Sequence, residues 1–264
     1  MRLDASLRAL ALAALLALAA RANAADAPAG AAGATATGNP VVVELFTAQG
    51  CSSCPPADRL LSKMATEPEW QGRLIALGFH VDYWNFGGWT DPFSAGVYTD
   101  RQNAYMKALP PGRGAYTPQA IVNGKTVCVG SDERVLRQLL AEAAAAPAGK
   151  VELALRRDGS KVVADIVAAP PSGFAGNLDV ALALVENGLE TEVKAGENAH
   201  RTLRDDFVVR RFQRAFKVKG GEQRDTVSLR IERGWKSENM RLAVFLQDPE
   251  TKAIVGAASA PVPQ

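Results

Sequence analysis

Between residues 41 and 146 the hydrophobic pattern switches repeatedly between the period of a strand and that of a helix. Short runs rich in Val, Leu and Ile are typical of buried strands, and longer stretches with apolar residues three and four apart are typical of helices. The predicted strands are 41–46, 73–81 and two more within 119–129, and the predicted helices are 57–65, 94–109 and 132–145. The last two strands meet at Asn123-Gly124, a strong signal for a two-residue hairpin. The predicted order is therefore β-α-β-α-β-β-α.

This order predicts a thioredoxin-like domain over residues 41–146, with fold class α/β. A right-handed crossover makes the first two strands parallel, the hairpin adds an antiparallel pair, and the helices cover the sheet. From residue 150 onward the pattern consists of short strand-like runs separated by turns, including a hairpin at Asp158-Gly159. We expect a smaller all-β, sandwich-like domain over residues 150–264, without a helix of useful length.

The first 40 residues follow neither period. Residues 1–24 combine Arg2 and Arg8 with an Ala/Leu run and a small-x-small ending, which predicts a signal peptide. Residues 25–40 consist mainly of Ala, Gly, Thr and Pro, and we expect a flexible linker. The mature protein is thus expected to be exported by a bacterium, periplasmic or secreted, with no stable membrane insertion after cleavage.

Composition and charge narrow the classes of function. Hydrophobic residues make up 47% of the chain, which is ample for an apolar core. A formal net charge of +2 with acids and bases interspersed gives no nucleic-acid or membrane footprint. No cofactor is expected, because no Gly-rich phosphate loop or catalytic triad order stands out. We interpret His200 as a surface residue, and one basic run as the solvated side of a strand: Arg210, Arg211, Arg214, Lys217 and Lys219.

The candidate chemistry lies in FTAQGCSSCPPADRLL, where Cys51 and Cys54 stand between a strand and a helix. Unpaired backbone N–H groups at a helix start carry positive partial charge, which stabilises a thiolate. Pro55 and Pro56 fit the first helical turn. A proline also disfavours helical dihedrals in the residue before it, which leaves Cys51 in the loop. With three cysteines in the chain, Cys128 is left over.

Four segments resemble a secreted, thioredoxin-like bacterial family known as domain of unknown function 1223. They are VVVELFTAQGCSSCPPAD, HVDYWNFGGWTDPFS, YTPQAIVNG and GENAHRTLRDDFVVR, and the resemblance covers nearly all of the mature chain. It implies a thioredoxin-like fold with a candidate redox pair, and it supplies no established substrate. In such folds a cis-proline packs beside the dithiol loop, so we expect a cis Thr117–Pro118 bond with the Thr117 backbone facing a substrate. Glu44 is the nearest candidate for a buried proton shuttle, with an ordinary polar strand residue as the alternative.

Three functions compete at this site. In a thiol–disulfide oxidoreductase, Cys51 attacks or is attacked, Cys54 resolves the mixed disulfide, and Pro118 lines the peptide groove. Its partners would be protein thiols or disulfides, or a redox partner protein. In a copper- or zinc-handling protein, Cys51, Cys54 and His80 would be the ligands. In a non-catalytic binding module, the disulfide would be structural.

Two further expectations concern the surroundings of the pair. The aromatic loop 82–93 is expected to be an internal plug rather than a binding face, and the exposure of Trp84 and Trp89 discriminates between the two. Cys128 is expected to be a free thiol in an apolar setting. A two-residue hairpin turn places it opposite Gln119.

Overall fold

A computed structural model of the 264-residue chain describes residues 32–35, 39–110 and 114–264. The predicted signal peptide, residues 1–24, lies outside the described residues, as does most of the predicted linker, residues 25–40. Within the described ranges, no helix is long and apolar enough to cross a membrane.

Residues 41–144 form strands and helices in the order that the sequence predicts. The elements are β2 (Val41–Thr47), α2 (Pro55–Thr66), β3 (Leu74–His80), α3 (Gly96–Ala108), β4 (Gln119–Val122), β5 (Thr126–Val129) and α4 (Glu133–Ala144). Strands β2 and β3 are buried at every position, which explains their continuous apolar sequence. Buried residues recur three and four apart in α2 and α4, so each helix lays one face on the sheet.

Residues 150–264 form strands, with one short 3-10 turn among them. The elements are β6 (Lys150–Asp158), β7 (Lys161–Ala169), β8 (Asn177–Glu186), β9 (Leu189–Val193), β10 (Arg201–Asp205), β11 (Val208–Lys219), β12 (Gln223–Arg230), η2 (Ser237–Asn239), β13 (Met240–Gln247) and β14 (Ile254–Pro261). The all-strand character predicted for this segment is confirmed. The hairpin of β9 and β10 has no counterpart in the sequence-based expectations.

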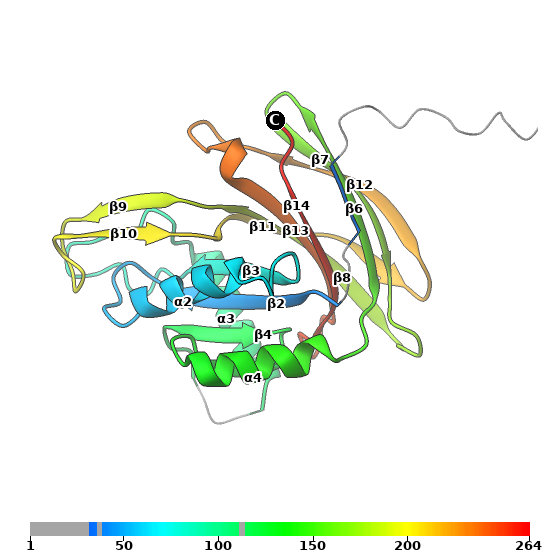
Figure 1. The fold of residues 1–264 in the computed structure, drawn as a ribbon, viewed down its shortest axis with the longest axis horizontal. Coiled ribbons are helices and arrows are strands. Elements are labelled where there is room, and N and C mark those ends of the chain that lie inside the picture. The colour runs from blue at the N-terminus through cyan, green and yellow to red at the C-terminus, as the bar shows by residue number, and fades with distance from the viewer. Residues whose placement is uncertain (1–31, 36–38, 111–113) are drawn as a thin grey trace, which may run out of the picture. The chain divides into compact units, whose positions relative to one another are not determined.

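Strands from both segments form one eight-stranded sheet, in the order β14-β13-β8-β11-β3-β2-β4-β5 (Figure 1). Strands β2 and β3 are parallel, and β4 and β5 add the antiparallel pair. The two segments join where Val208 of β11 pairs with Gly78 of β3. The sequence predicts separate domains over 41–146 and 150–264, whereas the structure unites their strands. The open edge of β3 would otherwise present unpaired backbone groups to solvent.

A second sheet, β1-β6-β7-β12, packs on the C-terminal part of the large sheet. Strand β1 (Ala32–Thr35) runs antiparallel to β6, with Ala32 opposite Leu155 and Thr35 opposite Glu152. This corrects the expectation of a flexible linker throughout residues 25–40. Pairing along a strand edge uses backbone groups, so a segment of small residues can still extend a sheet.

Among the residues that the structure describes, three apolar clusters fill the interior. One lies between the two sheets, a second lies under α2 and α4, and a third lies on the other face of the large sheet, under α3. The third cluster draws on both segments, because it joins Phe46 and Phe79 with Phe245. The ring of Phe79 also lies 5.7 Å from that of Phe212 on β11. Shared burial of aromatic rings therefore reinforces the joined sheet.

The hairpin of β4 and β5 differs by one residue from the prediction. Lys125 is an extra residue after the Asn123-Gly124 turn, so the connection between the two strands has three residues instead of two. Cys128 consequently pairs with Ala120, and the prediction that Gln119 lies opposite it is wrong.

Candidate functional site

Cys51 and Cys54 form a disulfide between the end of β2 and the start of α2, with their Cα atoms 5.4 Å apart. The helix begins at Pro55, with Cys54 at the N-cap position. The backbone N–H groups of Ala57 and Asp58 both donate to the Cys54 carbonyl. Cys51 lies in the loop, as the proline pair indicates. The partial charge of the helix N-terminus therefore acts more directly on Cys54 than on Cys51.

Both cysteines are fully buried, at 0% exposure, although Ser52 and Ser53 between them are exposed. The Sγ atom of Cys51 lies 3.4 Å from the Ser53 hydroxyl oxygen. Residues 194–200, the connection between β9 and β10, are hydrogen-bonded to the cysteine loop.

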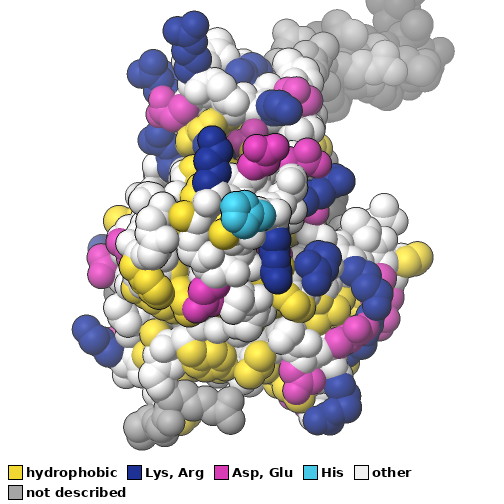
Figure 2. All heavy atoms as spheres, turned by 90° about the vertical axis from the view of Figure 1, so that its left-hand side faces the viewer, with side chains coloured by type: hydrophobic (Ala, Val, Ile, Leu, Met, Phe, Trp, Pro, Cys, Tyr) yellow, Lys and Arg dark blue, Asp and Glu magenta, His cyan; other side chains and the backbone are white. Residues whose placement is uncertain are grey.

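Two side chains of this connection hold the backbone of the cysteine loop. Asn198, itself fully buried, donates from Nδ2 to the carbonyls of Gln49 and Cys51, each at 2.9 Å. Glu197 accepts from the Ser52 N–H at 3.0 Å, and hydrogen bonds from Ser52 lower the pKa of Glu197. The hairpin and the cysteine loop lie together at the left of Figure 1, and Figure 2 views that end directly. Figure 2 shows hydrophobic, acidic and basic side chains together on that face.

Behind the cysteine loop lies a cluster of buried polar side chains. His80 Nδ1 lies 2.7 Å from Asp91 Oδ2, which also accepts from the Gln49 N–H at 2.8 Å. Gln49 Nε2 donates to Asp205 of β10 at 2.7 Å. Burial disfavours the imidazolium, but attraction to Asp91 outweighs it and raises the pKa of His80 to about 9. Although burial opposes it, His80 in turn lowers the pKa of Asp91. The two form a charged pair at neutral pH.

Asp58 faces this cluster from the first turn of α2. Burial raises the pKa of Asp58 to about 7, repulsion from Asp205 adds to the rise, and His80 opposes it. Burial also raises the pKa of Asp205. Asp58 follows Cys54 by four residues, so the two side chains are neighbours on one helix face. A carboxyl that retains a proton near neutral pH thus adjoins the disulfide. The signal for Asp58 in the sequence is an acid four residues after Cys54, on a helix face that is otherwise apolar.

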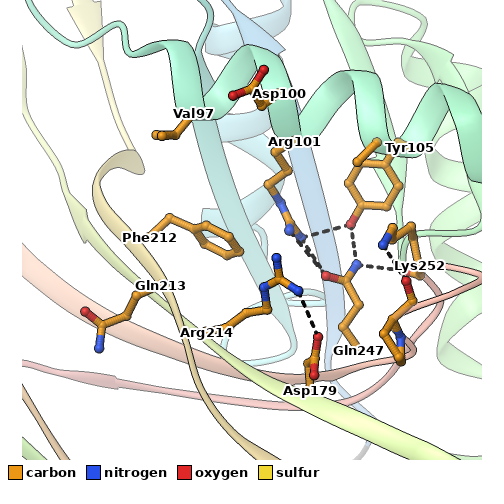
Figure 3. Close-up of a pocket in the computed structure, with 12 residues that line it drawn as sticks. Val97, Asp100, Arg101, Tyr105, Asp179, Phe212, Gln213, Arg214, Gln247 and Lys252 are labelled. Atoms are coloured by element: carbon orange, nitrogen blue, oxygen red, sulfur yellow. Dashed lines mark hydrogen bonds and ion pairs between the residues drawn. The ribbon is translucent and has the colours of Figure 1, made fainter.

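Glu44, the candidate proton shuttle, belongs to a different network. It is fully buried and pairs with Arg101 of α3, the Nε–Oε2 distance being 2.5 Å. The Tyr105 hydroxyl donates to Glu44, and Gln247 of β13 bonds to Arg101 and Tyr105. Figure 3 shows Arg101, Tyr105 and Gln247 facing one another in a pocket of about 370 Å³. Glu44 therefore balances a buried guanidinium, and Asp58 is the acid beside the cysteines.

The Thr117–Pro118 bond is cis, as predicted. Thr117 Oγ1 accepts from the indole N–H of Trp84 at 2.7 Å. The backbone of Trp84 in turn lies against Gly50, where an added Cβ would meet the Trp84 carbonyl oxygen at 2.7 Å. Trp84 thus connects the segment before β4 with the cysteine loop.

The aromatic loop 82–93 is only partly internal. Trp84 and Trp89 are half-buried, whereas Tyr83 is 39% and Phe86 58% exposed. The Trp84 and Phe86 rings stack with centroids 5.4 Å apart. The expectation of an internal plug therefore needs correction: one side of the loop packs on its neighbours, and the other presents aromatic rings to solvent.

The three residues of the metal alternative do not form a ligand set. Cys51 and Cys54 are joined to each other, and His80 Nδ1 is engaged by Asp91. Over the part of the chain that the structure describes, no group of three or more His, Cys, Asp or Glu side chains could hold a metal ion. Cys128 is buried in the apolar cluster under α2 and α4, whereas the disulfide belongs to the cluster on the other face of the sheet.

The remaining basic and histidine residues divide between surface and interior. His200 is exposed, as expected. Lys217 and Arg214 are exposed and pair with Asp179. Arg210 departs from the expected solvated side of a strand, because it is half-buried with its guanidinium over aromatic rings.

Together these features define a mixed α/β protein, mostly sheet, with a buried disulfide where a strand passes into a helix. Residues 42–247 match the family described as "Protein of unknown function (DUF1223)", and the chain belongs to that family. No curated protein matches the chain.

Two solved structures share the fold over most of their length. Protein AGR_C_4864 from Agrobacterium tumefaciens is 34% identical, with a TM-score of 0.64 over 84% of this chain and 94% of that chain. HBP35 of Porphyromonas gingivalis is 15% identical, with a TM-score of 0.63 over 85% of this chain and 76% of that chain. The latter likeness concerns the fold alone.

Proposed function

We propose that the protein is an exported thiol–disulfide oxidoreductase that acts through Cys51 and Cys54 on protein thiols or disulfides. The observation that carries the proposal is a disulfide at a strand-to-helix junction beside a carboxyl, Asp58, that is poised near neutral pH. The element order from β2 to α4 and the strand order β3-β2-β4-β5 support a thioredoxin-like arrangement of this half.

Reduction of the Cys51–Cys54 disulfide by a partner consists of two successive displacements by thiolates. A partner thiolate attacks Cys51 Sγ, and the bond to Cys54 breaks. Cys54 leaves with the electron pair as a thiolate, and Asp58 donates its proton to that sulfur. A second partner thiolate then attacks the partner sulfur of the mixed disulfide and releases Cys51 as a thiolate. The two protons given up by the partner thiols go to Cys51 and back to Asp58. The partner ends as a disulfide, and two electrons and two protons have passed to this protein. The reverse sequence reduces a partner disulfide.

The setting of the site supports a protein partner outside the cytoplasm. The predicted signal peptide leads to a compartment where disulfides persist. The exposed rings of Tyr83 and Phe86 lie on the loop that packs against the cysteine loop, where they offer apolar contact to another polypeptide.

A structural disulfide is the second candidate, and the complete burial of both cysteines favours it. In that case Cys51–Cys54 clips the loop to the helix, and reduction requires that the protein unfold. The two candidates therefore differ in whether the folded protein can be reduced.

The test equilibrates the mature chain in a series of dithiothreitol redox buffers and maps the thiols by alkylation and mass spectrometry. We expect one two-electron transition at Cys51–Cys54 while the circular dichroism stays native, with the same transition in a Cys128→Ala control. Asp58→Asn should slow reduction at about pH 6 by about tenfold and flatten its pH dependence near 7. Reduction that accompanies unfolding, and never precedes it, would establish the structural clip instead.

A further inference from the structure

We infer that the β9–β10 hairpin is a lid over the disulfide and controls the access of a partner thiolate to it. The inference rests on the proposed function. Thiol–disulfide exchange requires an attacking thiolate to reach a sulfur atom, and its rate depends on that access. Both cysteines are fully buried, and the connection 194–200 is hydrogen-bonded to the loop that carries them. The hairpin must leave this position before a partner can attack Cys51.

Asn198 makes the main hydrogen bonds that hold the lid closed. Its amide nitrogen has two N–H groups, and each is used on a different carbonyl of the cysteine loop, those of Gln49 and Cys51. Its Oδ1 accepts from Arg201 at 3.0 Å, which fixes the orientation of the amide. These bonds are made only with the hairpin closed.

Packing of the tip on the aromatic loop adds a second contact. A Cβ built on Gly87 would lie 3.6 Å from Gly196 Cα, and one on Gly88 would lie 3.4 Å from Ala195 Cβ. The tip thus rests on two loops at once, the one that carries the cysteines and the one that carries Phe86.

The base of the hairpin is the proposed hinge of the lid. Strands β9 and β10 pair with each other and, within the described residues, are not part of either larger sheet. Gly188 and Phe207 at the base have left-handed backbones, with φ of +67° and +56°. The Phe207 N–H donates to Asn187 Oδ1 at 2.8 Å, and the Gly188 N–H donates to Asp206 Oδ1 at 2.8 Å. Rotation of the hairpin about this base breaks the Gln49–Asp205 hydrogen bond but no ladder of the eight-stranded sheet.

Opening of the lid exposes a short backbone edge beside the disulfide. The carbonyls of Gln49 and Cys51 and the N–H of Ser52 lose the partners that Asn198 and Glu197 supply. An extended polypeptide offers donors and acceptors of the same kind. The partner that this edge fits is thus an extended segment of a protein, which replaces the hairpin as it docks.

The experiment compares the full mature chain with Asn198→Ala and with a tip replacement, in which Asn-Gly joins Val193 to Arg201, its cross-strand partner. Reduction by dithiothreitol is timed by alkylation, and hydrogen exchange reports on the Ser52 amide. We expect about tenfold faster reduction for Asn198→Ala, which removes the two bonds to the carbonyls of the cysteine loop. The tip replacement should give a larger increase, because it also removes the bond from Ser52 to Glu197. The Ser52 amide should exchange faster in both, while Lys194→Ala, an exposed position on the same connection, should match the parent.

Equal reduction rates and equal Ser52 exchange in all four proteins would overturn the lid. Circular dichroism establishes that each variant is folded, and if Asn198→Ala unfolds, the tip replacement decides by itself. A third outcome separates the two proposals: the tip replacement is folded and its Ser52 amide exchanges fast, but its disulfide still resists dithiothreitol. That result would support the lid and overturn the proposed oxidoreductase function.

Discussion

Two acidic residues near the site, Glu44 and Asp58, face different charges. Glu44 meets the guanidinium of Arg101 at 2.5 Å, so the cost of burying each charge is offset by the other. Asp58 is turned toward Asp205, whose repulsion adds to the effect of burial, and His80 compensates only in part. The neighbours thus make one acid a structural counter-ion and the other a group that can exchange a proton.

We predict that Asp58→Asn stabilises the protein at about pH 8 and leaves its stability unchanged near pH 4. The folded-state pKa of Asp58, about 7, lies above its ordinary value of 3.8, so between these values the folded protein holds a proton that the unfolded chain has lost. Stability therefore falls as pH rises through this window, and asparagine escapes that loss. Urea unfolding should show a gain on the order of 2 kcal/mol at the higher pH.

Glu44→Gln supplies the matched contrast. It leaves Arg101 buried with a neutral neighbour, so the free energy of unfolding should drop by about 3–5 kcal/mol across the same pH range. If Asp58→Asn were instead less stable than the parent at about pH 8, Asp58 would be an ionised partner in the folded state, and its role as proton donor would be wrong.

Strands and helices with a strong local period can be predicted from the sequence, and those held by distant contacts cannot. The elements between residues 41 and 144 follow from short-range patterns and are observed. The β9 and β10 sequences, LETEV and RTLRD, are five residues long and hold few apolar residues, so their strand signal is weak. Strand β1 is likewise hidden in an Ala- and Gly-rich stretch. These three form because a partner strand lies beside them.

The same division applies to the site. Cys51, Cys54 and the cis Thr117–Pro118 bond were accessible from local spacing and from resemblance. Asn198 contacts Cys51 from 147 residues away along the chain, and no periodicity records such a contact. Its segment does belong to the resemblance, in GENAHRTLRDDFVVR, which was the one available sign that this stretch has a role.

Gly50 is the point where the cysteine loop and the aromatic loop touch. Because an added Cβ would lie 2.7 Å from the backbone oxygen of Trp84, one of the loops must shift. We predict that Gly50→Ala costs about 2 kcal/mol and shifts tryptophan fluorescence toward that of an exposed ring. Gly221→Ala is the control, since an added Cβ there meets no heavy atom within 4 Å. Parent-like fluorescence and unfolding in Gly50→Ala would show that the two loops can separate freely.

The two segments that the sequence divides at about residue 150 are hydrogen-bonded to each other at separate points. The Gly78 N–H of β3 donates to Phe207 at 2.8 Å, and the Ile254 N–H donates to Asn123 at 2.8 Å. At Gly124 an added Cβ would lie only 2.0 Å from the Lys252 carbonyl oxygen, so glycine permits this approach. A junction this close should make the two segments unfold together.

We therefore predict one cooperative unfolding transition, and we expect that residues 39–146 do not fold alone. Cutting there would uncover the edge of β3 and the apolar face around Phe46 and Phe79, which Phe245 helps to cover. Phe245→Ala should lower the free energy of unfolding by about 3–5 kcal/mol and move circular dichroism and tryptophan fluorescence transitions together. Phe86→Ala, at a ring 58% exposed, should stay within about 0.5 kcal/mol of the parent. Separate transitions, with Phe245→Ala moving only one, would restore two independent domains.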